Sequence, residues 1–531
     1  MIFRDLTKEI TEKLIQEWAD QQRTARIREY ETRYAELQSD VFGAARQQTY
    51  WPRRADEEPE RYKERTKIWV PWADIVSRRL ASVCLSGKCE RKFVPLADSD
   101  QTEADRANEL LELTDEVGNW EAAAHAVYYL ALGVGEVSLW PEYRLYSRES
   151  GEKYETAGGD GVVFWQDWLP WFVEPVVSDE RVNEPIGAVK LYYWDGKQAT
   201  AYLNQIVASA VGTTRVVTEI YLAPIFDHIT AAEIYAGTYK KWVNGKEDYR
   251  GVPEGMQGVN PYRCNPVVTF RGPDPDESGY RGRGYGERFR NLAIEHSRLI
   301  SSIGQAIDLL PNIWIYRGEE KSAKKVVIRH SGIIHIPEGE PPGDFKQAAR
   351  ELNLTEDWKL ADYLDSFIHV CGQLPQGFLR DMAGVGKTES GVALKIVFQP
   401  ILEAMESIRA EFGRAEKLRM VNTVKIVNAN NKGREIDLAK LRPEISYNED
   451  LIPANAAQDL LDDLSLLGVG ALTLRDIVKK YNPNVTTDEQ ADAVIAERER
   501  KEAATQPRGF MIPPLRGSSP QIPQSTQGNQ K

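Results

Sequence analysis

The segment that most resembles a catalytic motif is the glycine- and lysine-containing stretch GVGKT at 384–388. A phosphate-binding loop needs the pattern G-x-x-x-x-G-K-[ST], because successive backbone N–H groups must wrap the phosphates. Asp381 stands where the first glycine of that pattern would be, and its carboxylate would repel a phosphate. The upstream run reads as a helix followed by Pro375, whereas a phosphate-binding loop follows a buried strand. The stretch therefore favours a flexible loop between helices over a nucleotide site.

A second glycine-rich stretch, RGRGYG at 281–286, has glycine at every second position. The dinucleotide-binding pattern G-x-G-x-x-G would require another glycine at 287, where the chain has Glu287. The stretch therefore predicts a turn that leads into a helix, and no cofactor is expected there.

The histidines and cysteines form no recognisable set of metal ligands. His296 lies on the apolar face of a predicted helix, which is typical of a packed core histidine. His330 and His335 are five residues apart in predicted strands, so their side chains should point to opposite faces. Cys84 and Cys89 have four residues between them, and no second pair completes a zinc site. We therefore expect free thiols, no metal and no catalytic residue.

A basic group lies in a short segment of strand-like runs. Such a group is usually a solvated face, but it could also contact DNA or a protein partner. Both interpretations stay open for its members, which are Arg317, Lys321, Lys324, Lys325 and Arg329.

The elements in the first half of the chain change from helical to β-rich. Residues 1–50 and 73–84 read as helices, and a single helix is predicted over 101–132. From about 134 to 270, short runs of Val, Tyr, Trp and Ile alternate with turn residues, which indicates strands. Two dipeptides in this region, Asp195-Gly196 and Asn244-Gly245, are typical of type I′ hairpin turns.

Two helices then bracket a strand-rich insert. Apolar residues spaced three and four apart, from Phe289 to Leu310, predict the first helix. The second helix is predicted over 357–370, with Thr355 as its N-cap, Glu356 and Asp357 in its first turn, and Gly372 as its end.

The longest predicted helix covers 391–428, and Pro400 should kink it, because proline lacks an N–H and clashes with the preceding turn. A strand-like stretch follows at 442–450. Two later helices begin with capping-box pairs, Thr473 with Asp476 and Thr487 with Gln490.

The bulk composition narrows the class of protein. The chain has 531 residues and a formal net charge of −13. Proteins that coat DNA by neutralising phosphates carry a basic surface. The negative net charge therefore argues against a DNA-coating protein. It is compatible with a protein that lets DNA slide past. The start MIFRDLTKEI has no apolar core of a signal peptide, so we expect a soluble protein made in the cytoplasm.

Several stretches, taken in order, resemble the portal proteins of tailed bacteriophages, in particular the siphophage type. The resemblance covers about 75 to 500, and each stretch alone is weak whereas the ordered set is fairly specific. Gly286 stands where the family commonly has serine, and Ala471 and Leu472 precede Thr473 where it usually has serine. The stretches are IVSRRLASVCLSG (75–87), NPYRCNPVVTFRGP (260–273), KTESGVALKIVFQPILE (387–403) and NEDLIPANAAQDLLDDLSLLGVGALTLRDIV (448–478).

The resemblance implies an α+β portal fold with wing, helical stem, α/β clip and helical crown, assembled as a ring of twelve. Its parts would be wing 1–286, stem helix 287–310, clip 311–356, stem helix 357–372, tunnel loop 373–390, wing 391–454, crown 455–502 and a disordered tail 503–531.

The resemblance also implies a function without bond-making chemistry. Such a ring sits at one vertex of the virion capsid and is assembled in the host cytoplasm. Double-stranded DNA passes through it during packaging, retention and ejection. Its protein partners would be the terminase large subunit, the head–tail adaptor, and the major capsid and scaffolding proteins, with no membrane. The clip, with its basic residues, is where terminase and adaptors should dock.

The tunnel loop supplies the candidate channel residues. Arg380 and Lys387 could retard moving DNA, or they could simply be solvated. The glycines would let the loop change shape. The full candidate set is Gly377, Arg380, Asp381, Gly384, Gly386 and Lys387. Two alternatives to a portal protein remain: a P-loop NTPase of the packaging motor, and another head–tail connector protein.

Overall fold

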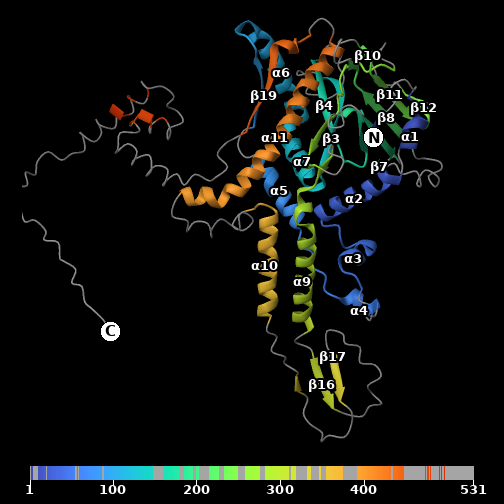
Figure 1. Ribbon diagram of the computed structural model, residues 1–531, viewed down its shortest axis with the longest axis vertical. Helices are drawn as coiled ribbons and strands as arrows, with labels where there is room; N and C mark the ends of the chain where they lie inside the picture. The colour runs from blue at the N-terminus through green and yellow to red at the C-terminus, as the bar shows by residue number, and fades with distance from the viewer. Residues whose placement is uncertain are drawn as a thin grey trace, which may run out of the picture. The chain divides into compact units, whose positions relative to one another are not determined.

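The fold is described from a computed structural model, and it is α+β, as the sequence predicts (Figure 1). The chain divides into two compact units, Met1–Ile452 and Pro453–Lys531, and each is treated by itself. The structure describes residues 2–3, 10–18, 21–53, 55, 57, 59–85, 89–146, 160–178, 185–194, 199–201, 215–226, 233–248, 258–275, 281–309, 313–317, 332–336, 346–347, 354–374, 391–431, 435–447, and 473, 475, 476, 479, 490, 492, 495 and 496.

The described N-terminal residues are mostly helical, as predicted for 1–50 and 73–84, except that Ile2 and Phe3 form a short strand. The last of these helices buries Val76, Leu80 and Cys84 in the largest apolar cluster of the unit. Among the described residues, no helix is both long enough and apolar enough to cross a membrane. The helices are α1 (Glu12–Trp18), α2 (Gln21–Leu37), α3 (Ala44–Tyr50), α4 (Pro59–Glu64) and α5 (Trp72–Cys84).

The single helix predicted over 101–132 is wrong, because the structure has two helices there. α6 covers Gln101–Gly118 and α7 covers Trp120–Val134. Asn119 between them has φ +48°, a left-handed conformation that ends a right-handed helix and that asparagine tolerates better than most residues.

The β-rich region forms a seven-stranded sheet and a three-stranded sheet. The large sheet runs β1-β5-β6-β8-β11-β12 with β7 on β6, and the small one runs β13-β3-β4. The strands are β1 (Ile2–Phe3), β3 (Glu136–Tyr146), β4 (Asp160–Trp168), β5 (Val173–Ser178), β6 (Pro185–Trp194), β7 (Ala199–Ala201), β8 (Arg215–Leu222), β11 (Thr238–Val243), β12 (Lys246–Glu247) and β13 (Val268–Arg271), with small pairs β9 (Ile225–Phe226) with β10 (Glu233–Tyr235) and β14 (Asp274–Pro275) with β15 (Gly282–Arg283).

One of the two predicted hairpin turns is confirmed. Asn244 and Gly245 join β11 to β12, and both have positive φ, 52° and 78°, as a type I′ turn requires. The other pair, Asp195-Gly196, lies outside the described residues.

The long helix α11 (Gly391–Asn430) contains Pro400 as predicted. Figure 1 draws it as two stretches of different direction, the shorter at its N-terminal end. The predicted apolar face is buried from Ile401 through Met405, Ile408 and Phe412. The strand pair β2 (Glu90–Pro95) and β19 (Leu441–Ser446) packs beside α11 and confirms the predicted strand near 442–450.

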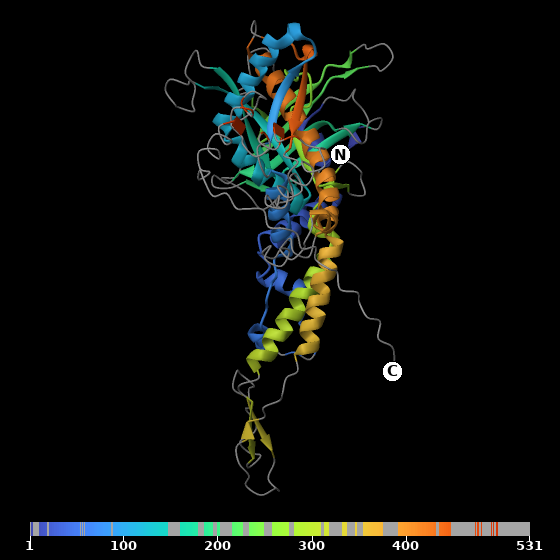
Figure 2. The same cartoon turned by 90° about the vertical axis from the view of Figure 1, so that its left-hand side faces the viewer.

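Two helices bracket a small sheet, as the sequence predicts. The short 3₁₀ turn Tyr285–Arg288 leads into α9 (Arg290–Leu309), and α10 (Thr355–Cys371) returns beside it (Figures 1 and 2). Gly372 ends α10 and acidic residues fill its first turn, as predicted. The predicted N-cap is wrong by one residue: Leu354 holds that position, and Thr355 is the first helical residue.

The described part of the insert between the helices is a three-stranded sheet. β16 (Ile313–Arg317) pairs in parallel with β17 (Gly332–Ile336) and antiparallel with β18 (Lys346–Gln347). β16 begins four residues after α9 ends, so the sheet must start within about 14 Å of that end.

The glycines of the RGRGYG stretch have a structural role. A Cβ on Gly282 would lie 2.3 Å from the carbonyl oxygen of Gly135, and one on Gly284 would lie 2.4 Å from that of Gly133. Gly135 itself has φ +120°. Backbones from distant parts of the chain therefore cross at contact distance, which only glycine permits. The turn that leads into a helix is confirmed.

In the second unit, the predicted capping box at Thr473 and Asp476 is confirmed. The Thr473 N–H donates to Asp476 Oδ2 at 2.9 Å, and the Asp476 N–H donates to Thr473 Oγ1 at 3.3 Å. Thr487 lies outside the described residues, as does the tail 503–531.

Candidate functional site

The base of the helix pair is held by hydrogen bonds between the turn before α9 and the end of α10. The Tyr285 hydroxyl donates to the carbonyl oxygen of Gly372 at 2.7 Å. The Arg288 guanidinium donates to both carboxylate oxygens of Asp274, at 2.6 and 2.7 Å, and to Gln373 Oε1 at 2.7 Å. These bonds fix where the two helices leave the rest of the unit.

A buried histidine joins the pair to α5. Trp72 Nε1–H donates to Nδ1 of His296 at 3.2 Å, so His296 is the satisfied core histidine that the sequence predicts. Burial lowers the pKa of His296 below its ordinary value, although Asp365 and Asp362 on α10 act in the opposite direction. At neutral pH the ring is therefore uncharged and accepts the indole proton.

The outer side of α10 carries a stripe of exposed apolar side chains. Leu360, Tyr363, Phe367 and Val370 are 50%, 64%, 56% and 72% exposed. Their 3-4-3 spacing places them on one side of the helix. Ile368, on the other side, is in the same buried cluster as Ala293 of α9 and Phe289, which directly precedes α9. The stripe therefore faces away from α9, and we call these four residues the α10 stripe.

Such a stripe is unusual on the surface of a single chain. Burying one large apolar side chain contributes about 1.5–3 kcal/mol, and contiguous exposed patches of this kind mark protein interaction sites. The spacing was available in the sequence, where α10 reads as apolar on two sides, Ala361 and Ile368 on one and the stripe on the other. Periodicity alone could therefore have identified the stripe, but the sequence interpretation above did not single it out.

A second feature is a buried ionic cluster that joins α11 to α6, α7 and β2. Glu416 accepts from Arg419 Nε at 2.9 Å, from Arg91 at 3.0 Å and from Trp120 Nε1 at 3.1 Å. Arg419 is fully buried and also donates to Asp115 at 2.6 Å. Burial alone would raise the pKa of Glu416, but Arg419 and Arg91 outweigh it and hold that pKa below its usual range. The carboxylate therefore stays charged.

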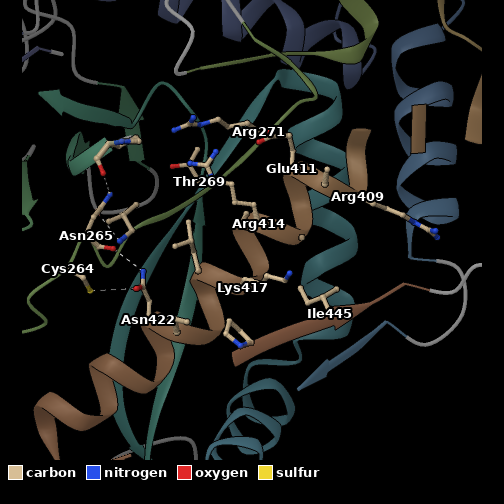
Figure 3. Close-up of a pocket in the computed structure, with 18 of the residues that line it drawn as sticks. Cys264, Asn265, Thr269, Arg271, Arg409, Glu411, Arg414, Lys417, Asn422 and Ile445 are labelled. Carbon is tan, nitrogen blue, oxygen red and sulfur yellow. Dashed lines mark hydrogen bonds between the residues drawn. The ribbon is translucent and has the colours of Figure 1, made fainter. Parts of the chain in front are cut away.

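On its exposed side, α11 forms one wall of a groove of about 1040 Å³, and β13 and β19 contribute to the lining. Figure 3 shows Arg271 and Thr269 across from Arg414 and Lys417 of α11. Five basic residues line the groove against two carboxylates. The basic residues are Arg271, Arg409, Arg414, Lys417 and Lys425, and the acidic ones are Glu406 and Glu411. We call it the α11 groove.

The predicted site residues are described only in part. All the tunnel-loop candidates, Gly377, Arg380, Asp381, Gly384, Gly386 and Lys387, lie outside the described residues. Of the clip candidates, Arg317 ends β16. The others, Lys321, Lys324, Lys325 and Arg329, lie outside the described residues, as does His330.

All four cysteines are described and are free thiols, as predicted, whereas the other potential metal ligands are described over part of the chain only. Within that part, no group of three or more His, Cys, Asp or Glu side chains is arranged to hold a metal ion. Cys84 is buried, and burial raises the pKa of its thiol to about 12, so it is not a reactive thiolate at neutral pH.

A comparison with protein-family models found no match for this chain, and a search of curated proteins found none either.

Proposed function

We propose that this chain is the subunit of a portal ring, the channel at one capsid vertex through which a tailed bacteriophage packages, retains and ejects its DNA. The observation that carries the proposal is the α10 stripe on a helix pair that brackets a small sheet. An exposed apolar stripe on such a pair is what a wall made of many copies requires. The resemblance of the ordered sequence stretches points to the same class of protein.

The direction of the stripe suggests how copies would pack. α9 covers one side of α10, and the stripe lies on the opposite side. A neighbouring copy that covers the stripe with its own α9 would continue an alternating row of helices. A heterologous contact of this kind closes into a ring when the rotation per copy divides a full turn. We propose twelve copies.

The proposed mechanism is geometric and electrostatic. Twelve copies multiply every channel-facing side chain twelvefold, so one carboxylate per subunit makes an acidic collar. Such a collar disfavours tight phosphate binding and lets DNA move, which fits a net charge of −13 per chain. Arg380 and Lys387 would retard the DNA, and glycines 377, 384 and 386 would let their loop change shape. The clip would dock the terminase and later the head–tail adaptor.

Imaging and mass measurement test the proposal. Negative-stain micrographs of the purified chain should show rings with a central hole, and native mass spectrometry should give twelve copies. A monomer at high protein concentration would contradict the proposal.

ATP turnover provides a separate check, with Lys387→Ala as its control: hydrolysis that depends on Lys387 would favour a packaging NTPase instead.

A further inference from the structure

The exposed side of α6 carries a row of carboxylates. Asp105, Glu109, Glu112 and Glu116 are exposed and spaced four, three and four residues apart. At 100° per residue they fall within about 60° of one another on the helix. No described side chain forms an ion pair with Glu109, Glu112 or Glu116. We call the four residues the α6 stripe.

The α11 groove has the opposite charge. Arg414, Lys417 and Lys425 lie on its α11 wall, and none of the three has an ion-pair partner among the described residues. Leu418 on the same side of α11 is 48% exposed. Positive charge concentrated on one face of a chain of net charge −13 would attract a partner that is locally acidic.

The two surfaces match in length. Lys425 lies eleven positions after Arg414 on α11, and Glu116 lies eleven positions after Asp105 on α6. Each row is therefore about 16 Å long at 1.5 Å per residue. Two straight helical rows of equal length can align along their whole extent.

The two surfaces of one chain cannot meet each other. Ala107 and Leu111 of α6 pack with Met420 and Val424 of α11 in one apolar cluster. The α6 stripe lies on the side of α6 opposite these residues, so it faces away from α11. The acidic row can reach a groove only on another molecule.

We infer that the α6 stripe of one copy docks into the α11 groove of the next copy, as a heterologous, charge-paired contact. This inference rests on the proposed ring and adds the surfaces by which neighbouring subunits recognise each other. The contact differs on its two sides, so each subunit gives an acidic row to one neighbour and receives one from the other. It lies apart from the α10 stripe and directs the order of assembly, because opposite charges steer encounters before apolar surfaces are buried.

The groove is less suited to the other occupants that its charge could attract. At about 1040 Å³ it is slightly larger than typical small-molecule sites. Glu406 and Glu411 in its lining would repel the continuous phosphates of a nucleic acid. A helix with spaced carboxylates can place its charges between them.

Charge reversal in the full-length chain tests the inference. One variant, Glu112→Lys with Glu116→Lys, reverses two of the four charges of the stripe, and another, Arg414→Glu with Lys417→Glu, reverses two of the five basic charges of the groove. Each alone should shift assembly to more than about tenfold higher protein concentration, because like charges would face each other. The matched control is Glu60→Lys with Glu64→Lys, an exposed pair on α4 with the same spacing as the stripe pair, and it should assemble normally.

A one-to-one mixture of the two variants is the decisive sample. Stripe-reversed and groove-reversed chains should alternate around the ring and restore assembly, and native mass spectrometry should find equal numbers of each. The inference is overturned if either variant assembles like the wild-type chain, or if the mixture fails to assemble. Wild-type rings that both variants also form would refute this contact alone, whereas a wild-type chain that forms no ring refutes the proposed function.

Discussion

The hydroxyl of Tyr285 donates a hydrogen bond to the carbonyl oxygen of Gly372 at 2.7 Å. The two residues belong to the turn before α9 and to the end of α10, so one buried bond joins the start and the finish of the helix pair. Apolar packing of Tyr285 in the main cluster holds the hydroxyl in place.

Replacing Tyr285 with phenylalanine should destabilise this junction. The change keeps the ring and leaves the Gly372 carbonyl without its donor, which costs about 1–3 kcal/mol of unfolding free energy. Urea denaturation of the dissociated chain measures the loss, and hydrogen exchange should rise at the amides of 368–374. Tyr363→Phe, which alters an exposed hydroxyl on α10, should leave both readouts unchanged.

A charge on the α10 stripe should prevent assembly. Phe367→Glu places a carboxylate where the proposed neighbour packs, and the lost burial alone corresponds to more than about tenfold weaker association. Sedimentation velocity against protein concentration provides the measurement. Ala122→Glu adds the same charge at an exposed position of α7 and should not change the profile. Equal assembly of the two variants would remove the main support for the ring.

Neutralising Glu416 should be costly for the fold. Glu416→Gln removes the carboxylate that the buried Arg419 shares with the half-buried Arg91, and breaking a buried ionic pair in this way costs about 3–5 kcal/mol. Thermal unfolding followed by circular dichroism measures the effect. Glu406→Gln, at an exposed position on the same helix, removes the same charge and should be nearly neutral.

Acid should weaken the packing around His296. Because burial lowers the pKa of His296, the unfolded chain binds its proton more readily than the folded chain does. The stabilisation is complete above the unfolded pKa of about 6.5. It falls as the pH drops from there toward the folded pKa. His296→Gln, which keeps an acceptor for Trp72, should flatten this part of the stability–pH curve. An unchanged slope in the variant would mean that other groups cause it.

A single added methyl group should destabilise the close backbone contact between Gly282 and Gly135. Gly282→Ala would place a Cβ 2.3 Å from the Gly135 carbonyl oxygen, and relieving such overpacking costs about 1–3 kcal/mol. Gly118→Ala is the matched control, because nothing lies within 4 Å of its Cβ and alanine favours a helix. Chemical denaturation should show the first variant weakened and the second unchanged or slightly stabilised.

Local signals predicted most of the described elements. The Asn244-Gly245 turn, the apolar face of α11 and the Thr473–Asp476 cap all depend on neighbouring residues, which a sequence displays directly. The break between α6 and α7 was missed although Gly118 and Asn119 mark it, because the apolar spacing continues past them.

Contacts between segments that are distant in the chain could not be predicted from the sequence pattern. Nothing in the local pattern pairs Glu416 with Arg91 or brings Gly282 against Gly135, because these residues are separated by more than a hundred positions. The predicted tunnel-loop and clip residues stay predictions. The α10 and α6 stripes could have been read from spacing, but only the structure distinguishes an exposed row from a buried one.

The Tyr285–Gly372 bond also has a consequence for how the chain can be rearranged. The two bonded residues are 87 positions apart in the sequence but lie in direct contact. Exchanging the segment between them would therefore lengthen no connection in the rest of the chain, although its first helix also accepts a hydrogen bond from Trp72 through His296. A foreign helix–sheet–helix segment that keeps the α9 side chains facing α5 could be transplanted between these two residues, so a chimera could acquire new docking specificity and keep its own scaffold.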